Sequence, residues 1–131
     1  MKLLLDTHIW IWSVSEWHRL ARQVQQQLLD PECEKWLSPI STWELILLTE
    51  KQRFSSPLSP AAWIERARSY VNWHEAPLTA EVALEAATVK LSYRDPSDRL
   101  LLATARWYGL KLVTADERLL AHGGAAVLPN R

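Results

Sequence analysis

The feature that most constrains this chain is the segment from Asp95 to Asp116, which predicts a helix followed directly by a buried strand. Pro96 suits the first helical position, and apolar residues then recur at helical spacing. Gly109 is a typical left-handed stop, and the short apolar run at 110–113 predicts a strand. One aspartate therefore begins the helix and another follows the strand. In an open α/β sheet, ligands bind outside the carboxyl ends of the strands.

The same pattern occurs twice more. Residues 2–5 predict a strand that ends at Asp6, and residues 36–40 predict a strand that leads into a helix at 41–51, which carries Glu44. Because the carboxyl ends of parallel strands meet at one edge of a sheet, we expect the acids at these ends to lie together. The four acids expected there are Asp6, Glu44, Asp98 and Asp116.

Four carboxylates at one site would repel one another unless a cation lay between them. No lysine is beside any of the four in sequence, so a divalent cation is expected to fill that role. Oxygen-only ligands favour Mg²⁺ or Mn²⁺ over zinc. The sequence therefore predicts a site for one or two Mg²⁺ or Mn²⁺ ions.

Each acid also has a purely structural interpretation. The residues at 41–44 fit a capping box, in which Glu44 would bond back to the backbone amide of the cap residue. Asp95 would cap its helix with Asp98 one turn further on, and Asp116 would cap the last helix. The first acid would simply form a turn. For one acid alone these interpretations are as good as the functional one, but four acids at one expected edge favour a shared site.

The rest of the chain alternates helices with short strands. We expect further helices near residues 8–14, 19–29, 61–73 and 79–91, an edge strand near 75–78 and a last strand near 125–128. This pattern predicts one α/β domain over residues 1–131, with a mainly parallel central sheet of four to five strands and helices on both faces. The helix at 8–14 is apolar almost all round, so it would be buried by the core or by a second subunit.

Composition limits the function classes. With 15 basic and 15 acidic side chains the formal charge is zero, which argues against a strongly basic nucleic-acid coat but allows a local basic patch. Cys33 is the only cysteine, which favours a reducing compartment and a cytoplasmic location. No apolar run approaches the ~18 residues that a membrane span requires, so we expect no membrane association.

Four motifs, taken in order, resemble those of the PIN-domain ribonucleases, and in particular the VapC toxins of bacterial toxin–antitoxin pairs. They are Leu3-Leu4-Leu5-Asp6-Thr7-His8, Ser41-Thr42-Trp43-Glu44, Asp95-Pro96-Ser97-Asp98-Arg99 and Thr114-Ala115-Asp116, and together they cover essentially the whole chain. The resemblance implies a single PIN-like domain that hydrolyses the phosphodiester bonds of a structured RNA with Mg²⁺ or Mn²⁺. It also implies a small cognate antitoxin as partner and a homodimer.

The resemblance assigns roles to the acids. Asp6, Asp98 and Asp116 would ligate the metal, and Glu44 would ligate it, directly or through water, or would orient the attacking water. The metal would lower the pKa of bound water and stabilise the charge that develops on phosphorus. Auxiliary roles fall to Thr7, Thr114 and Asp95, the last of which would contact the metal or only cap its helix.

The basic residues allow two interpretations. Arg99 follows Asp98 directly and would form either a salt bridge or a contact to a substrate phosphate. Five scattered arginines would line an RNA groove or lie on a solvated surface: Arg19, Arg22, Arg53, Arg94 and Arg106. His8 is expected at a helix start, without a catalytic role.

Two other function classes remain open. A phosphohydrolase with an aspartyl nucleophile would carry a second aspartate two residues after Asp6, where this chain has His8. A PIN-like module that binds RNA without cutting it would be expected to lose at least one of the four acids, and all four are present. Metal-dependent RNA cleavage by the purified protein would separate these classes from a ribonuclease.

Overall fold

The computed structural model describes all 131 residues and contains one five-stranded sheet in which every strand is parallel to its neighbours. β1 (Lys2–Leu5) is central, with β2 (Glu34–Leu37) and β4 (Lys111–Thr114) beside it. The edges are β3 (Trp73–Glu75) and β5 (Val127–Pro129). The predicted mainly parallel sheet of four to five strands is therefore confirmed.

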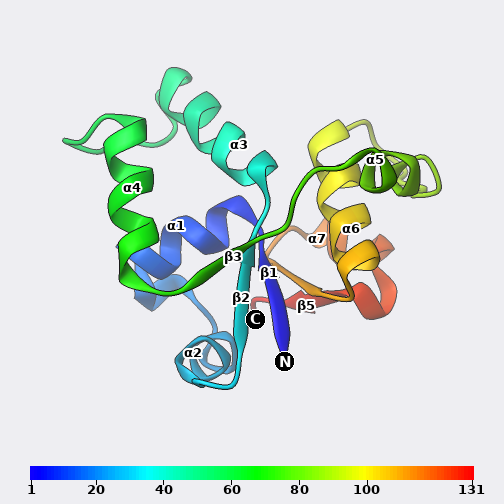
Figure 1. The fold of residues 1–131 in the computed structure, drawn as a ribbon, viewed down its shortest axis with the longest axis horizontal. Helices are drawn as coiled ribbons and strands as arrows, with labels where there is room; N and C mark the ends of the chain where they lie inside the picture. Colours follow the sequence, from blue (N-terminus) through cyan, green and yellow to red (C-terminus); the bar gives the residue numbers. More distant parts are fainter.

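Seven helices cover the two faces of this sheet, as predicted, and Figure 1 shows α1 and α4 on one side of β1 and β2 and α6 on the other. The helices are α1 (Thr7–Ser15), α2 (Arg22–Leu29), α3 (Pro39–Glu50), α4 (Pro60–Tyr70), α5 (Ala80–Ala86), α6 (Pro96–Tyr108) and α7 (Glu117–His122). Two short 3-10 turns, η1 (Trp17–Arg19) and η2 (Gly124–Ala126), complete the secondary structure. None of these helices has the length and apolar character needed to cross a bilayer.

The central strand is buried on both faces. Leu3 and Leu5 pack into the core beneath α1 to α4, whereas Leu4 points to the opposite face and packs with Leu101 of α6 and Leu119 of α7. All three strand leucines are fully buried. This is why the strand is a continuous apolar run rather than an alternating one.

The apolar helix α1 is buried by the chain's own core. Ile9, Trp10 and Ile11 all belong to the core cluster of that face, and the Trp10 ring packs edge-on against Trp63 of α4 at 5.3 Å. Of the two explanations for its apolar character, burial in the core of the same chain accounts for these three residues.

Several boundaries differ from the prediction: α4 ends at Tyr70 rather than 73, β2 spans Glu34–Leu37 rather than 36–40, and β3 spans Trp73–Glu75 rather than 75–78. α3 begins at Pro39, two residues earlier than expected, because the Ser38 hydroxyl accepts a hydrogen bond from the backbone of Ile40 and proline suits the first helical position. The helix predicted at 19–29 is divided, and α2 begins only at Arg22. The N–H of Ala21 donates to the side chain of Asn130 at 2.6 Å, a contact that sequence spacing could not indicate.

The helix predicted at 79–91 begins with Thr79 as its cap, as expected, but ends at Ala86. Side chains satisfy the carbonyl groups at its end. Thr88 Oγ1 donates to the carbonyl of Glu85 at 2.7 Å, and the Arg99 guanidinium donates to that of Ala86 at 3.1 Å. The same carbonyls also accept backbone hydrogen bonds from Thr88 at 3.0 Å and Val89 at 3.2 Å, so the helix ends in a tighter turn.

Candidate active site

Five carboxylates line one pocket of about 580 Å³ beyond the carboxyl ends of β1 and β4, which we call the acid pocket. The five residues are Asp6, Glu44, Asp95, Asp98 and Asp116. Asp6 and Asp116 follow strands, Glu44 lies on α3, and Asp95 and Asp98 lie at the start of α6. The structure therefore brings together the four acids predicted from the sequence, together with the auxiliary acid.

Asp6 is fixed by contacts with β4 and with the first residue of α1. Its backbone N–H continues the ladder to Val113 of β4 at 3.0 Å. Its carboxylate accepts hydrogen bonds from the N–H of Thr7 at 2.8 Å and from the Thr114 hydroxyl at 2.7 Å. Burial raises the pKa of Asp6, and these hydrogen bonds only partly oppose the increase. The Thr114 hydroxyl and the backbone N–H of Thr7 therefore orient this carboxylate.

Glu44 is not part of a capping box. Because α3 begins at Pro39 with Ser38 as its cap, Glu44 lies well inside the helix. Its carboxylate instead accepts a hydrogen bond from the Thr7 hydroxyl at 2.7 Å. Burial raises the pKa of Glu44, and the negative charges of Asp6 and Asp95 raise it further. The helix-capping interpretation of Glu44 is therefore wrong, and the residue faces the other acids.

Asp98 is the most buried acid of the pocket, with 6% of its surface exposed. Its Oδ2 accepts a hydrogen bond from the Tyr93 hydroxyl at 3.0 Å. Asp95 is the cap of α6, because its side chain accepts from the backbone N–H of Asp98 at 3.2 Å, and it also lines the pocket. Burial, and then the charge of Asp95, raise the pKa of Asp98 to about 7. Ionisation of Asp98 is therefore costly near neutral pH.

Asp116 is held differently, by a cation that sequence analysis missed. The Arg118 guanidinium contacts Asp116 Oδ2 at 3.1 Å and Oδ1 at 3.3 Å, and the Arg118 N–H donates to Oδ1 at 2.9 Å. Although burial acts in the opposite direction, these contacts lower the pKa of Asp116. The expectation that the acids have no protein cation among them is therefore wrong for Asp116. Its sequence signal was an arginine two residues after the acid, in the first turn of α7.

Tyr93 was also not predicted from the sequence, and it links Asp98 with the Asp116–Arg118 pair. Its hydroxyl bonds Asp98, and the Arg118 guanidinium that bonds Asp116 lies over its ring, 4.3 Å from the centroid. Burial, and then the bond to Asp98, raise the pKa of Tyr93, so the hydroxyl keeps its proton and stays a donor. No motif marks Tyr93 in the sequence, because its role depends on the loop before α6 folding back over the pocket.

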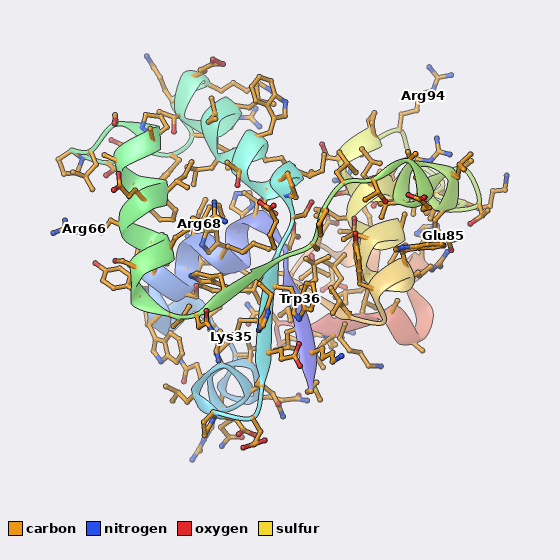
Figure 2. All side chains as sticks on the ribbon, in the orientation of Figure 1. Lys35, Trp36, Arg66, Arg68, Glu85 and Arg94 are labelled. Carbon is orange, nitrogen blue, oxygen red and sulfur yellow. The ribbon has the colours of Figure 1, made fainter.

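The predicted arginines are divided among several surfaces. Arg53 lines the acid pocket, but the Arg99 side chain donates to the end of α5 and does not line it. Arg19 lines a neighbouring pocket. Arg94 projects outward at the far side of the molecule, where Figure 2 shows it well away from α4. Arg22 and Arg106 are exposed. A substrate contact by Arg99 remains a prediction.

The donor set of the acid pocket fits a hard divalent cation, since it consists of carboxylate oxygens with hydroxyl groups behind them. No three of the acidic, histidine or cysteine side chains converge closely enough to form a ready-made metal site. Instead, each of the four principal acids is engaged by a donor of the chain. Burial is the main cause of the raised pKa values of Asp6, Glu44 and Asp98, so a cation bound among them would stabilise their ionised forms.

Comparison with known proteins identifies the class to which this fold and pocket belong. Residues 3–124 match the PIN domain family, and the chain belongs to that family. It is 33% identical over 121 residues to Ribonuclease VapC22 of Mycobacterium tuberculosis (strain ATCC 25618 / H37Rv), covering 92% of this chain and 91% of that protein. The resemblance predicted from the four motifs is thus confirmed.

Solved structures share the fold. A chain of VapBC2 from Rickettsia felis, determined bound to a DNA fragment from its promoter, superposes with a TM-score of 0.72 over 98% of both chains at 15% identity. A chain of FitAcB from Neisseria gonorrhoeae gives a TM-score of 0.67 at 22% identity, over 98% of this chain and 96% of that one. At these identities the likeness concerns the fold alone.

Proposed function

We propose that this protein is a metal-dependent ribonuclease that acts as the toxin of a bacterial toxin–antitoxin pair. The observation that carries the proposal is the acid pocket itself, in which five carboxylates from distant parts of a PIN-family chain gather. The similarity to a protein named Ribonuclease VapC22 supports RNA as the substrate. The chemistry is hydrolysis of a phosphodiester bond.

Asp6, Asp98 and Asp116 would hold one or two Mg²⁺ or Mn²⁺ ions, and Glu44 would join them directly or through water. When bound, such an ion lowers the pKa of water and stabilises charge on the phosphate. Thr7 and Thr114 orient the carboxylates of Glu44 and Asp6 through hydrogen bonds of 2.7 Å. Tyr93 does the same for Asp98.

Glu44 is the best-placed group for handling the proton of the attacking water. Its carboxylate is half-buried, is oriented by a single hydroxyl donor and has a raised pKa. A carboxylate with a raised pKa is a better proton acceptor near neutral pH than an ordinary one. No serine–histidine or cysteine–histidine pair was found in the sequence that would favour a covalent route.

The test is cleavage of a labelled RNA by the purified protein in EDTA and after addition of Mg²⁺ or Mn²⁺. We expect cleavage only with metal, and none from the Asp98→Asn protein at any metal concentration. Undiminished cleavage in EDTA would overturn the metal mechanism. Binding without cleavage in all conditions would favour the non-catalytic RNA-binding alternative.

The toxin role adds a protein partner. The solved structures with this fold include VapBC toxin–antitoxin complexes, which supports a small antitoxin as the partner of this chain. Induced expression in a bacterial host should arrest growth, and expression of the Asp98→Asn protein to the same level should not. Equal growth arrest by both proteins would show that toxicity does not depend on the acid pocket.

We further propose a homodimer in the cytoplasm. The support for a dimer is now the large apolar side chains left exposed on α3 and α5, Trp43 at 54% and Leu84 at 72%, rather than the buried helix α1. The lone Cys33, which is buried and reduced, supports the location. Light scattering on the purified protein tests the first point, since a monomer at micromolar concentration would contradict it.

A further inference from the structure

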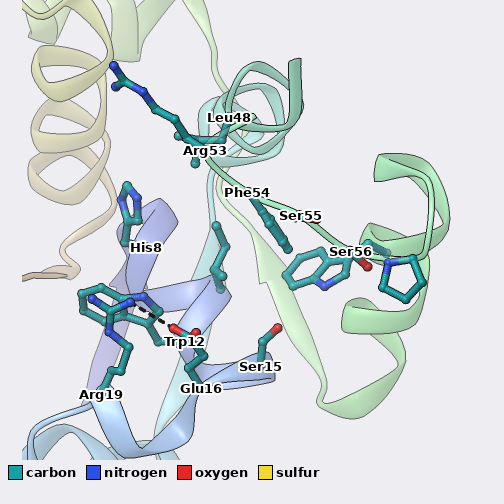
Figure 3. Close-up of a pocket in the computed structure, with 13 residues that line it drawn as sticks. His8, Trp12, Ser15, Glu16, Arg19, Leu48, Arg53, Phe54, Ser55 and Ser56 are labelled. Carbon is teal, nitrogen blue, oxygen red and sulfur yellow. Dashed lines mark hydrogen bonds and ion pairs between the residues drawn. The ribbon is translucent and has the colours of Figure 1, made fainter. Parts of the chain in front are cut away.

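A second pocket, of about 540 Å³, adjoins the acid pocket, and we call it the arginine pocket. The two pockets share four lining residues, His8, Trp12, Leu48 and Arg53. They are therefore two ends of one groove. Figure 3 shows the arginine pocket between α1 and η1 on one side and the segment that follows α3 on the other.

The charge of the groove changes along its length. The acid pocket holds five carboxylates against three cations, Lys51, Arg53 and Arg118, whereas the arginine pocket holds Arg19, Arg53 and a single acid, Glu16. Glu16 is already paired with Arg19 at 3.0 Å. None of the four ion pairs of the chain includes Arg53, so its charge remains available at the junction of the two pockets.

The backbone places Arg53 at that junction. α3 ends at Glu50, and Gln52 takes a left-handed conformation with φ of 58°. The N–H of Arg53 then donates to the carbonyl of Leu48, five residues back, at 2.8 Å, in the pattern that closes many helices. Arg53 is therefore fixed at its backbone while its exposed side chain remains free to reach a ligand.

The arginine pocket also presents planar groups. The Arg19 guanidinium lies over the Trp12 ring, 4.3 Å from its centroid, and Phe54 lines the opposite side of the pocket with its ring edge-on to Trp63 at 5.3 Å. Bases of single-stranded nucleic acids stack on aromatic rings and on guanidinium planes, while cations in the same groove contact the backbone. Few ligands other than a single-stranded nucleic acid would use both stacking groups and cations beside a site that acts on phosphate.

We propose that the arginine pocket binds the nucleotide adjacent to the cleaved bond of a single-stranded RNA segment, with Arg53 contacting the phosphate next to the cleaved one. The Trp12–Arg19 pair and Phe54 hold the base of that nucleotide. This proposal rests on the ribonuclease function and extends it, because it assigns the direction in which the strand leaves the acid pocket. The groove thus binds an RNA strand across at least two nucleotides.

Binding is measured with the Asp98→Asn protein, which holds RNA without cutting it, and with the same protein carrying Arg53→Gln. Fluorescence anisotropy is recorded for oligonucleotides shortened one nucleotide at a time from either end. In the parent we expect the Kd to rise about fivefold or more when one particular terminal nucleotide is removed, and only at one end. In the Arg53→Gln protein the same truncation should raise the Kd less than twofold. The slope of log K against log salt concentration should become shallower by ~0.7, which corresponds to about one phosphate contact.

The matched control is Arg106→Gln, which removes an equally exposed arginine on α6, away from both pockets. It should leave the length dependence unchanged. Arg53→Lys keeps the charge and should retain most of the affinity. An Arg53→Gln protein whose Kd and length dependence match those of the parent would overturn the proposal, as would equal losses with Arg106→Gln.

Cleavage kinetics of otherwise wild-type protein distinguish this proposal from the function on which it rests. Arg53→Gln should raise KM about five- to tenfold and leave kcat within twofold, since the residue contacts a phosphate that does not react. If wild type cleaves RNA and Arg53→Gln is indistinguishable from it, this inference is wrong and the ribonuclease assignment stands. If wild type cleaves no RNA with any metal, the ribonuclease assignment itself fails.

Discussion

Asp98 and Asp116 lie in the same pocket but are stabilised in opposite ways. Asp98 is buried, receives one neutral hydroxyl from Tyr93 and has a pKa of about 7. Asp116 is more exposed, receives a guanidinium from Arg118 and has a lowered pKa. The comparison shows that a cluster of acids need not be uniform: Asp98 has only a neutral donor, while Asp116 has a cation of its own.

The largest expected effect is on catalysis at the side of the pocket without a cation. Glu44→Gln keeps an oxygen that can accept from Thr7, and Glu44 is not a helix cap, so the fold should be retained. RNA cleavage should fall at least about 100-fold, because even the outer partners of metal ligands contribute about 10- to 100-fold. Initial rates and thermal melts of both proteins, measured in parallel, check this. A cleavage rate near that of wild type would show that Glu44 is not an active-site residue.

Asp98 should weaken the metal-free fold at neutral pH. Its folded-state pKa of about 7 lies above the ordinary value of 3.8, so the folded form binds more protons between these values. The contribution of Asp98 to the free energy of unfolding should therefore be most favourable below about pH 4 and should be lost as the pH rises through 7. Asp98→Asn in EDTA at pH 8 should melt several degrees higher than wild type, since 1 kcal/mol shifts Tm by roughly 3–6 °C for a domain of this size.

The same pair of proteins supplies the control. At pH 4.5, close to the ordinary pKa of 3.8, the difference in Tm should be much smaller than at pH 8. Excess Mg²⁺ should stabilise wild type by mass action and the mutant much less. An Asp98→Asn protein that melts lower at pH 8 and gains as much from Mg²⁺ as wild type would show that Asp98 is a structural residue.

Tyr93→Phe should reduce cleavage about tenfold, because the hydroxyl that orients Asp98 is lost while the ring beneath Arg118 is kept. The reduction should be in kcat, or in the metal concentration needed for half-maximal rate, rather than in KM for RNA. Tyr108→Phe is a suitable control, since the Tyr108 hydroxyl bonds the carbonyl of Pro77 outside the pocket. Equal losses in both variants would point to a general effect of hydroxyl removal.

The smallest expected effect is at the side that carries its own cation. Arg118→Gln removes the competitor for Asp116, and an exposed ion pair is a weak interaction. The Mn²⁺ concentration for half-maximal thermal stabilisation should therefore fall about two- to fivefold. Arg131→Gln, which breaks the exposed pair with Glu117, should leave it unchanged. Weaker Mn²⁺ binding by Arg118→Gln would mean that Arg118 supports the metal site instead of competing with it.

The sequence predicted the sheet, both of its helical faces and the meeting of the four acids, because those follow from apolar periodicity and from where strands end. It did not predict that α3 begins at Pro39, since the adjacent residues 41–44 formed a more recognisable capping pattern. Nor did it predict Arg118 or Tyr93. Their contacts depend on side-chain directions and on loops folding back, and neither property has a periodicity to detect.

The bond between Thr114 and Asp6 joins residues 108 positions apart in the chain. The central strand β1 likewise pairs with β4, from Leu3 opposite Lys111 to Leu5 opposite Val113. During translation, neither contact can form until the second half of the chain has left the ribosome exit tunnel, and such distant pairing is also slow. A growing chain therefore carries Asp6 without its hydroxyl donor and without Asp116. For a protein proposed to cut RNA, this order of synthesis keeps the nascent chain inactive beside the RNA that encodes it.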